Sequence, residues 1–240
     1  MTLAQSVVDQ LAARNVPVLC IDTCSVLDLL RDVTRDSISP ANVRSGLALL
    51  RCAEETEELV VLIAEQVSRE IADHVQDTED TSGAALSRFL AQAQRIHEVA
   101  VALGAEGELE IAHIEGHTTR ARLAFDRWET VATAIPQNAE LLARAWHRVQ
   151  TNRSPAKRGK DSTKDCIVIE AYLEVAANLR ALGMTAPIVF VSSNTKEYIA
   201  PGTSRIPEDL DVDFSTVGLT YAPNFSAAAY SLGLRRILPS

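Results

Sequence analysis

The stretch that decides the fold is residues 159–182, GKDSTKDCIVIEAYLEVAANLRAL. After its first four residues it contains neither proline nor glycine and is almost continuously apolar, which predicts a largely buried helix. With a step of 100° per residue, Asp165 lies within about 40° of Ile169 on the helical wheel. Glu170 and Glu174 cluster on the opposite side, which we therefore expect to be the solvated stripe. Asp165 thus points in the same direction as the apolar side chains.

A second acid, Asp161, lies one i,i+4 step before Asp165, so the two carboxylates share a face if the helical turn extends back that far. A helix core does not accept two neighbouring like charges without a partner, because desolvation and repulsion both oppose them. We therefore expect a metal ion, a cation or a set of amide donors in front of them. The alternative is that Asp161 and Ser162 only cap the helix, with Asp165 near its positive end. Whether other acids converge on the same point decides between these two interpretations.

The composition is that of an ordinary globular protein, with 240 residues of which 47% are hydrophobic and 23% are charged. No apolar run approaches the length of a membrane span, and the N-terminus lacks the layout of a secretory signal, so we expect a cytoplasmic protein without a membrane partner. The four cysteines form no CxxC pair, which argues against zinc and favours reduced thiols. The net charge of −9 argues against broad, non-specific nucleic-acid binding but allows a local basic strip.

Short apolar runs that alternate with helical patterns predict a parallel sheet covered on both faces by helices. These runs are residues 18–21, 59–63 and 188–191, with a further strand near 214–219. Asp22 follows the first run, and Ser193 and Asn194 follow the third. Glu70 lies beside the apolar stripe of the helix that follows the second run. Since open parallel sheets bind ligands at the carboxyl ends of their strands, one edge of the sheet gathers these side chains with Asp165. Such oxygen donors suit Mg²⁺ or Mn²⁺ rather than zinc.

Residues 77–150 begin with a polar break and then show helical patterns without an evident strand, which predicts a helical insertion over the α/β core. One helix is expected over residues 118–135 and another from Pro136, a favourable first helical position. Within this segment, His113 and His117 have the i,i+4 spacing of a metal-binding pair. Their order is not that of an HExxH motif, so zinc stays the weaker interpretation.

The loop NRSPAKRGK at residues 152–160 is the most basic stretch of the chain. It brings Lys157, Arg158 and Lys160 to the mouth of the predicted acidic site. One interpretation is a strip that contacts the phosphates of a substrate. The alternative is a solvated loop whose charges offset the nearby acids.

Four motifs appear in order along the chain: IDTCSVLDLL, VSREIADH, KDSTKDCIVIEAYL and FVSSNTKEY. Together they resemble the PIN-domain nucleases, Mg²⁺/Mn²⁺-dependent enzymes that mostly cut RNA. The resemblance implies that Asp22 and Asp165 bind the metal, while Glu70 binds it or orients the attacking water. Asp161 matches an extra acid of a larger PIN-like branch with KDS–KD motifs. The fourth motif usually carries an acid where this chain has Asn194, so that Asp161 and Asn194 complete the shell with one charge fewer.

On this resemblance, residues 1–240 form one three-layer α/β/α domain with a central parallel sheet and a helical insertion at about 77–150. The implied substrate is RNA, or single-stranded DNA, cleaved to leave a 5′-phosphate and a 3′-hydroxyl. The implied protein partners are a cognate antitoxin, as in toxin–antitoxin pairs, or a second copy of the chain. The implied substrate-binding residues are Thr23, Lys157, Arg158, Lys160, Lys164 and Ser193.

Two other functions stay open from the sequence. A PIN-like module that binds nucleic acid or a protein without cutting is favoured by the missing fourth acid at Asn194. A phosphatase with an aspartyl nucleophile at Asp22 is disfavoured, because the residue two positions later is Cys24 and not a second aspartate.

Overall fold

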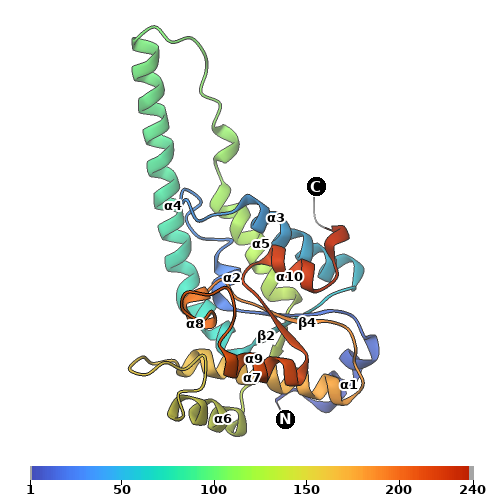
Figure 1. Cartoon of the computed structure of the whole chain (residues 1–240). Helices are drawn as coiled ribbons and strands as arrows, with labels where there is room; N and C mark the ends of the chain where they lie inside the picture. The colour runs from blue at the N-terminus through green and yellow to red at the C-terminus, as the bar shows by residue number, and fades with distance from the viewer. Residues whose placement is uncertain (1, 238–240) are drawn as a thin grey trace.

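The computed structural model describes residues 2–237 and has three layers, with a parallel sheet between two layers of helices (Figure 1). The predicted α/β/α architecture is confirmed. The strands are β1 (Val18–Ile21), β2 (Val60–Ala64), β3 (Thr133–Ile135), β4 (Ile188–Val191) and β5 (Leu219–Ala222). Their order in the sheet is β3-β2-β1-β4-β5, and every pairing is parallel. In the centre, Cys20 of β1 lies between Leu62 of β2 and Phe190 of β4.

The helices divide between the two faces of the sheet, with α1, α6, α7 and α9 on one side and α3, α5 and α10 on the other (Figure 1). The helices are α1 (Gln5–Arg14), α2 (Thr23–Leu27), α3 (Pro40–Arg51), α4 (Glu65–Ala102), α5 (His117–Val131), α6 (Ala139–Gln150), α7 (Thr163–Ala181), α8 (Thr195–Tyr198), α9 (Glu208–Val217) and α10 (Phe225–Ser231). Short π and 3₁₀ segments lie at Cys52–Thr56, Ala112–Ile114 and Arg235–Ile237. None of the described helices combines the length and apolar content that crossing a membrane requires.

The buried helix predicted from residues 159–182 is α7, and one of its side chains, Tyr172, fixes it to β1 and β2. The hydroxyl of Tyr172 donates a hydrogen bond to the carbonyl oxygen of Ile21 and accepts one from the Ala64 N–H at 3.0 Å. Ile21 and Ala64 are the last residues of β1 and β2. Tyr172 therefore fixes α7 against the carboxyl edge of the sheet, where polar side chains emerge.

The stripe of α7 around Glu170, which we expected to be solvated, is covered by α6. Buried Arg148 donates from Nε to Glu170 Oε1 at 2.8 Å, and Arg144 donates from Nε to Glu170 Oε2 at 3.1 Å. Arg144 also pairs with Glu174. The prediction was wrong because a charged stripe is also buried when a neighbouring helix supplies opposite charges, and the pattern of one helix does not show its neighbour.

The expected helical insertion at 77–150 differs from the structure at both of its ends. The predicted polar break is the middle of α4, which runs on and projects away from the body (Figure 1). An exposed helix needs no apolar stripe, and i,i+4 pairs such as Gln76 Nε2 to Asp80 Oδ1, at 2.9 Å, support it. Near its other end the segment contains β3, which pairs with β2. Three residues are too few to show the period of a strand, so the sequence did not reveal β3.

Two other boundaries are also displaced. The helix expected from Pro136 begins at Ala139, because the side chain of Asn138 caps it by accepting a hydrogen bond from the Leu141 N–H at 2.8 Å. The strand expected near 214–219 is β5, and most of the residues assigned to it belong to α9.

Candidate active site

Asp22 stands at the centre of the carboxyl edge of the sheet, directly after β1. Its side chain is buried, with 5% of the residue exposed, and Ser192 Oγ donates a hydrogen bond to its Oδ2 at 2.5 Å. Burial raises the pKa of Asp22 to about 7, with added repulsion from Asp165 and Glu70, while the Ser192 hydrogen bond acts in the opposite direction. The strand order thus brings a carboxylate into a position where its charge is costly unless a cation compensates it.

Glu70 reaches this point from the second turn of α4. Its carboxylate accepts hydrogen bonds from Thr23 Oγ1 at 2.9 Å and from Gln66 Nε2 at 3.1 Å. Thr23 is buried in the first turn of α2, next to Asp22 in the chain. One donor from each helix therefore holds the Glu70 carboxylate in a fixed orientation facing Asp22.

Asp165 contributes the third carboxylate from the first turn of α7. Burial raises its pKa to about 6, repulsion from Glu197 and Glu70 adds to this shift, and the positive charges of Lys160 and Lys157 oppose it. Among residues 2–237, no side chain or backbone group is shown donating a hydrogen bond to the Asp165 carboxylate. Its position in the helix is thus not explained by a capping bond.

Glu197 is a fourth acid of this site that the sequence analysis did not single out, although it lies in the quoted motif FVSSNTKEY. It is 7% exposed, and the short helix α8 directs it toward Asp165. Lys157 Nζ lies 3.2 Å from Glu197 Oε2, and Lys160 donates to Oε1. Burial would raise the pKa of Glu197, but the bonds to Lys160 and Lys157 outweigh it and lower the pKa. In the sequence, Glu197 could have been noticed as an acid three residues after Asn194. Its proximity to Asp165 depends on the helical turn of α8, which is too short to predict from the sequence.

Asp161 does not join these acids. The helix α7 begins at Thr163, so Asp161 precedes it and does not share the face of Asp165. Its side chain is exposed, and Oδ1 accepts a hydrogen bond from the Thr163 N–H at 3.0 Å. The expectation that both carboxylates point into one site is therefore wrong for Asp161. Its hydrogen bond to the first residue of α7 instead agrees with the alternative that Asp161 caps the helix.

The other predicted site residues divide between the edge of the site and the solvent. The Asn194 N–H donates to Ser192 Oγ at 3.1 Å, which places Asn194 beside the Asp22 partner. The Ser193 N–H donates to Ser25 Oγ at 3.0 Å, and the Ser193 hydroxyl is buried without a partner among the described residues. Arg158 and Lys164 are exposed. The lysines of the basic loop therefore lie at the mouth of the site, as expected, but in ion pairs with Glu197.

The donor atoms of these acids are of the type that binds a divalent cation. Their present spacing, however, is too wide to hold one. Within residues 2–237, no three acidic, histidine or cysteine side chains are close enough together to hold a metal ion as they are oriented. However, Asp22, Glu70 and Asp165 repel one another, and these acids offer carboxylate oxygens as ligands. Such a set suits Mg²⁺ or Mn²⁺, whose charge would offset that repulsion and draw the carboxylates together.

The predicted zinc alternative finds no support in the geometry. His113 lies in a 3₁₀ turn and His117 begins α5, with Gly116 in a left-handed conformation between them, so the two rings do not share a helix face. The four cysteines are free thiols.

The chain is similar to a known family over most of its length. A family model of the PIN domain matches residues 19–198, from β1 to the end of α8. This range contains Asp22, Glu70, Asp165 and Glu197, and it includes the projecting part of α4. The chain belongs to the PIN-domain family and has its nuclease-type fold. No similar curated protein and no similar solved structure was found.

Proposed function

We propose that the protein is a metal-dependent endoribonuclease that hydrolyses phosphodiester bonds in single-stranded RNA. The observation that carries this proposal is the convergence of three carboxylates from three elements on one sheet edge. Asp22 follows β1, Glu70 lies on α4 and Asp165 lies on α7, and burial, with added repulsion from neighbouring acids, raises the pKa of Asp22 and Asp165. A protein keeps such a costly arrangement where a cation and a phosphate use it.

Each residue of the site then has a distinct role. Asp22 and Asp165 hold Mg²⁺ or Mn²⁺, and Glu70, kept in place by Thr23 and Gln66, orients the attacking water or adds a ligand. The ion, when bound, activates water and stabilises negative charge on the phosphate. Asn194 orients a water on the side of β4, and Glu197 holds Lys157 and Lys160 at the mouth of the site.

The basic rim contacts the phosphates of the strand on this proposal. Replacing Lys157 and Lys160 together with alanine should weaken RNA binding and reduce the slope of log K against log salt by about 1.4, since each phosphate contact to a single strand contributes about 0.7. Fluorescence anisotropy over a salt series measures both quantities. Arg51→Ala, which removes an exposed charge at the end of α3, is the matched control. An unchanged slope in the lysine variant would show that the loop is only a solvated partner of Glu197.

The direct test of the activity uses the purified chain with an end-labelled single-stranded RNA. We expect cleavage that requires Mg²⁺ or Mn²⁺, stops with EDTA, and leaves 5′-phosphate and 3′-hydroxyl ends. Single-stranded DNA of the same sequence is the comparison substrate. RNA that stays intact over a full Mn²⁺ titration would contradict the proposal.

A PIN-like module that binds RNA without cutting it is the second candidate function. Two observations favour it: Asn194 stands where the family motif usually has an acid, and the carboxylates of residues 2–237 are not gathered at ligand distance. Binding without cleavage in the same titration would support this module. The resemblance also implies a cognate antitoxin or a second copy as partner, which co-purification and light scattering would test.

A further inference from the structure

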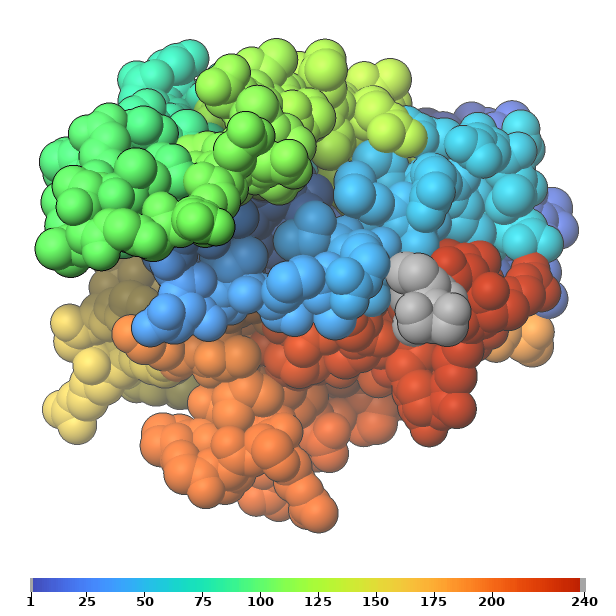
Figure 2. Space-filling model, turned by 90° about the horizontal axis from the view of Figure 1, so that it is seen from above, coloured from blue at the N-terminus to red at the C-terminus, as the bar shows by residue number. Residues whose placement is uncertain are grey.

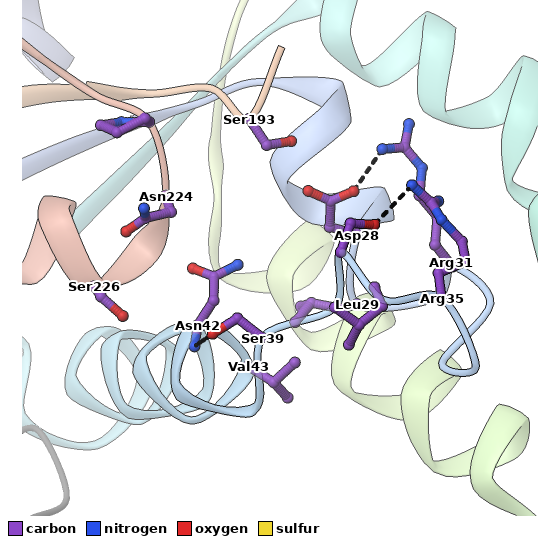
Figure 3. A pocket seen from close by; sticks show the side chains of 13 residues that line it. Asp28, Leu29, Arg31, Arg35, Ser39, Asn42, Val43, Ser193, Asn224 and Ser226 are labelled. Carbon is purple, nitrogen blue, oxygen red and sulfur yellow. Dashed lines mark hydrogen bonds and ion pairs between the residues drawn. The ribbon is translucent and has the colours of Figure 1, made fainter. Parts of the chain in front are cut away.

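A cavity opens at the end of α2 that lies away from Asp22 (Figure 3). It has a volume of about 520 Å³ and is lined by the segment that joins α2 to α3, by Ser193 after β4, and by the start of α10. The space-filling view shows the α2–α3 segment at the centre of one face, between the α4–α5 arm and the C-terminal third of the chain (Figure 2). The segment that lines the cavity therefore lies at the surface of the molecule.

The cavity lies one length of α2 away from Asp22, and Ser193 also connects it to the acidic site. Ser192 donates to Asp22, and the next residue, Ser193, lines the cavity. Asp22 precedes α2 and Asp28 follows it, so at roughly 1.5 Å per residue the two lie about 9 Å apart along the helix. A strand whose phosphate is held at Asp22 reaches the cavity with its neighbouring nucleotide.

The donors in the cavity have a fixed orientation. Asn42 Oδ1 accepts a hydrogen bond from the Phe225 N–H at 2.8 Å, and Asn224 Oδ1 accepts one from the Ala227 N–H at 2.8 Å. Because both oxygens are occupied, each amide presents its Nδ2 as a donor. The buried Ser193 hydroxyl has no partner among the described residues. The cavity thus offers donors to a ligand that is rich in acceptors.

The charge of the cavity favours an anion. Arg31 donates from Nη1 to Asp28 at 2.5 Å, and these two charges compensate each other. Arg35 is exposed, and its Nη2 donates to Ser37 Oγ at 3.2 Å (Figure 3). Its charge acts on Asp32 outside the cavity, but within the described lining it forms no ion pair, since Asp28 pairs with Arg31. A guanidinium with free donors suits a phosphate.

We infer that this cavity holds the nucleotide next to the scissile phosphate of a single-stranded RNA. Arg35 binds the phosphate of that nucleotide, Leu29 and Val43 contact its base, and the Nδ2 groups of Asn42 and Asn224 donate to carbonyl oxygens on the base edge. Uracil and guanine carry such oxygens and adenine does not, so the site discriminates against adenine at this position. This inference rests on the proposed function, since it uses Asp22 to fix the scissile phosphate.

The test separates binding from cleavage. Binding of a 3′-labelled single-stranded RNA is measured by anisotropy with Mn²⁺ in the Glu70→Gln variant, which keeps Asp22 and Asp165 to fix the scissile phosphate and lacks the carboxylate that orients the attacking water. In this background we expect Arg35→Ala to weaken binding about 10-fold and to reduce the salt slope by about 0.7. Arg205→Ala, an exposed arginine outside the cavity, should change affinity less than about twofold.

Asn224→Asp is the second variant, because it keeps the oxygen that caps α10 and replaces the donor by a negative charge. We expect unchanged thermal stability and loss of the preference for uracil over adenine at one varied position. RNA binding by both the Arg35 and Asn224 variants that equals the Arg205 control would overturn the inference. A second result would also overturn the inference: Arg35→Ala weakens binding of free uridine monophosphate but does not change binding of the oligonucleotide. The cavity would then bind a free nucleotide and not the RNA strand.

Different experimental results would contradict the proposed activity and the proposed nucleotide site. If wild type and Arg35→Ala cleave RNA with Mn²⁺ at the same rate and bind it equally well, the acidic site is supported as the active site. The cavity then does not bind the substrate. Wild-type protein that never cleaves, but whose binding depends on Arg35, supports the cavity as a nucleotide site and removes the hydrolytic function.

Discussion

Replacing Asp165 with asparagine should reduce RNA cleavage at least about 100-fold and remove most of the stabilisation that Mn²⁺ gives the wild-type protein. A bound metal contributes several kcal/mol to charge stabilisation in such a reaction, and each 1.4 kcal/mol is about a factor of ten in rate. At Mn²⁺ concentrations about 100 times the dissociation constant, binding stabilises the native state by about 2.7 kcal/mol, or roughly 5–10 °C in melting temperature. Without metal, the variant should be as stable as the wild type or more stable, because burial and repulsion oppose the charge of Asp165.

The matched control is Asp161→Asn at the start of the same helix. Its exposed side chain accepts a hydrogen bond from the Thr163 N–H, and asparagine can accept the same bond. This variant should keep both cleavage and the Mn²⁺ effect. Melting curves and cleavage rates of the three proteins, with EDTA and with Mn²⁺, make the comparison. An Asp165→Asn protein that Mn²⁺ stabilises as much as the wild type would show that the metal binds elsewhere.

The central fold was predictable because its strands are buried on both faces. Runs such as residues 18–21 and 188–191 are apolar without alternation, and this pattern is typical of a parallel sheet between helices. The edge position of Asp22 followed from the same pattern, since an acid directly after such a strand must lie at its carboxyl end. The helical wheel likewise placed Asp165 with the apolar face of α7, and the structure, in which Asp165 is half-buried, agrees.

Features that depend on a second element were not predictable from local patterns. From the sequence, Glu170 is expected to be solvated, whereas in the structure Arg148 of α6 pairs with it. Glu197 looks like a surface acid of α8 until Lys157 and Lys160 fold over it. The strand β3 carries too few residues to show a period. In each case the deciding partner lies more than 20 residues away in the chain, as the 22-residue separation of Arg148 and Glu170 illustrates.

The nucleotide cavity belongs to the same category. Arg35 lies in a polar loop, and Asn224 is the N-cap of α10. Neither position by itself indicates a binding site. Only the pairing of β4 with β5 brings the start of α10 next to Ser193 and the α2–α3 segment. Capping fixes the orientation of the Asn224 amide, so the same residue that ends a loop presents a donor to the cavity.

In the presence of EDTA, raising the pH from about 4 to about 7 should destabilise the wild-type protein relative to Asp22→Asn. The pKa of Asp22 is raised by burial, and by repulsion from Asp165 and Glu70, from 3.8 to about 7. Between these values the folded protein holds a proton that the unfolded chain releases, so the contribution of Asp22 to the free energy of unfolding falls as the pH rises through this window. The contribution is on the order of a few kcal/mol, since each pKa unit corresponds to about 1.4 kcal/mol.

Unfolding by urea at several pH values measures this difference. The two proteins should be about equally stable near pH 4, and Asp22→Asn should be the more stable one at pH 8, because asparagine can still accept the Ser192 hydrogen bond without a buried charge. Asp36→Asn, in the exposed loop after α2, controls for the loss of one acid. Saturating Mn²⁺ should reverse the trend for the wild type, since the ion binds only the deprotonated carboxylates and holds them charged in the folded state. Parallel stability curves for wild type and Asp22→Asn from pH 4 to 8 would show that Asp22 is not a strained carboxylate, and the cation would then have no repulsion to relieve at this edge of the sheet.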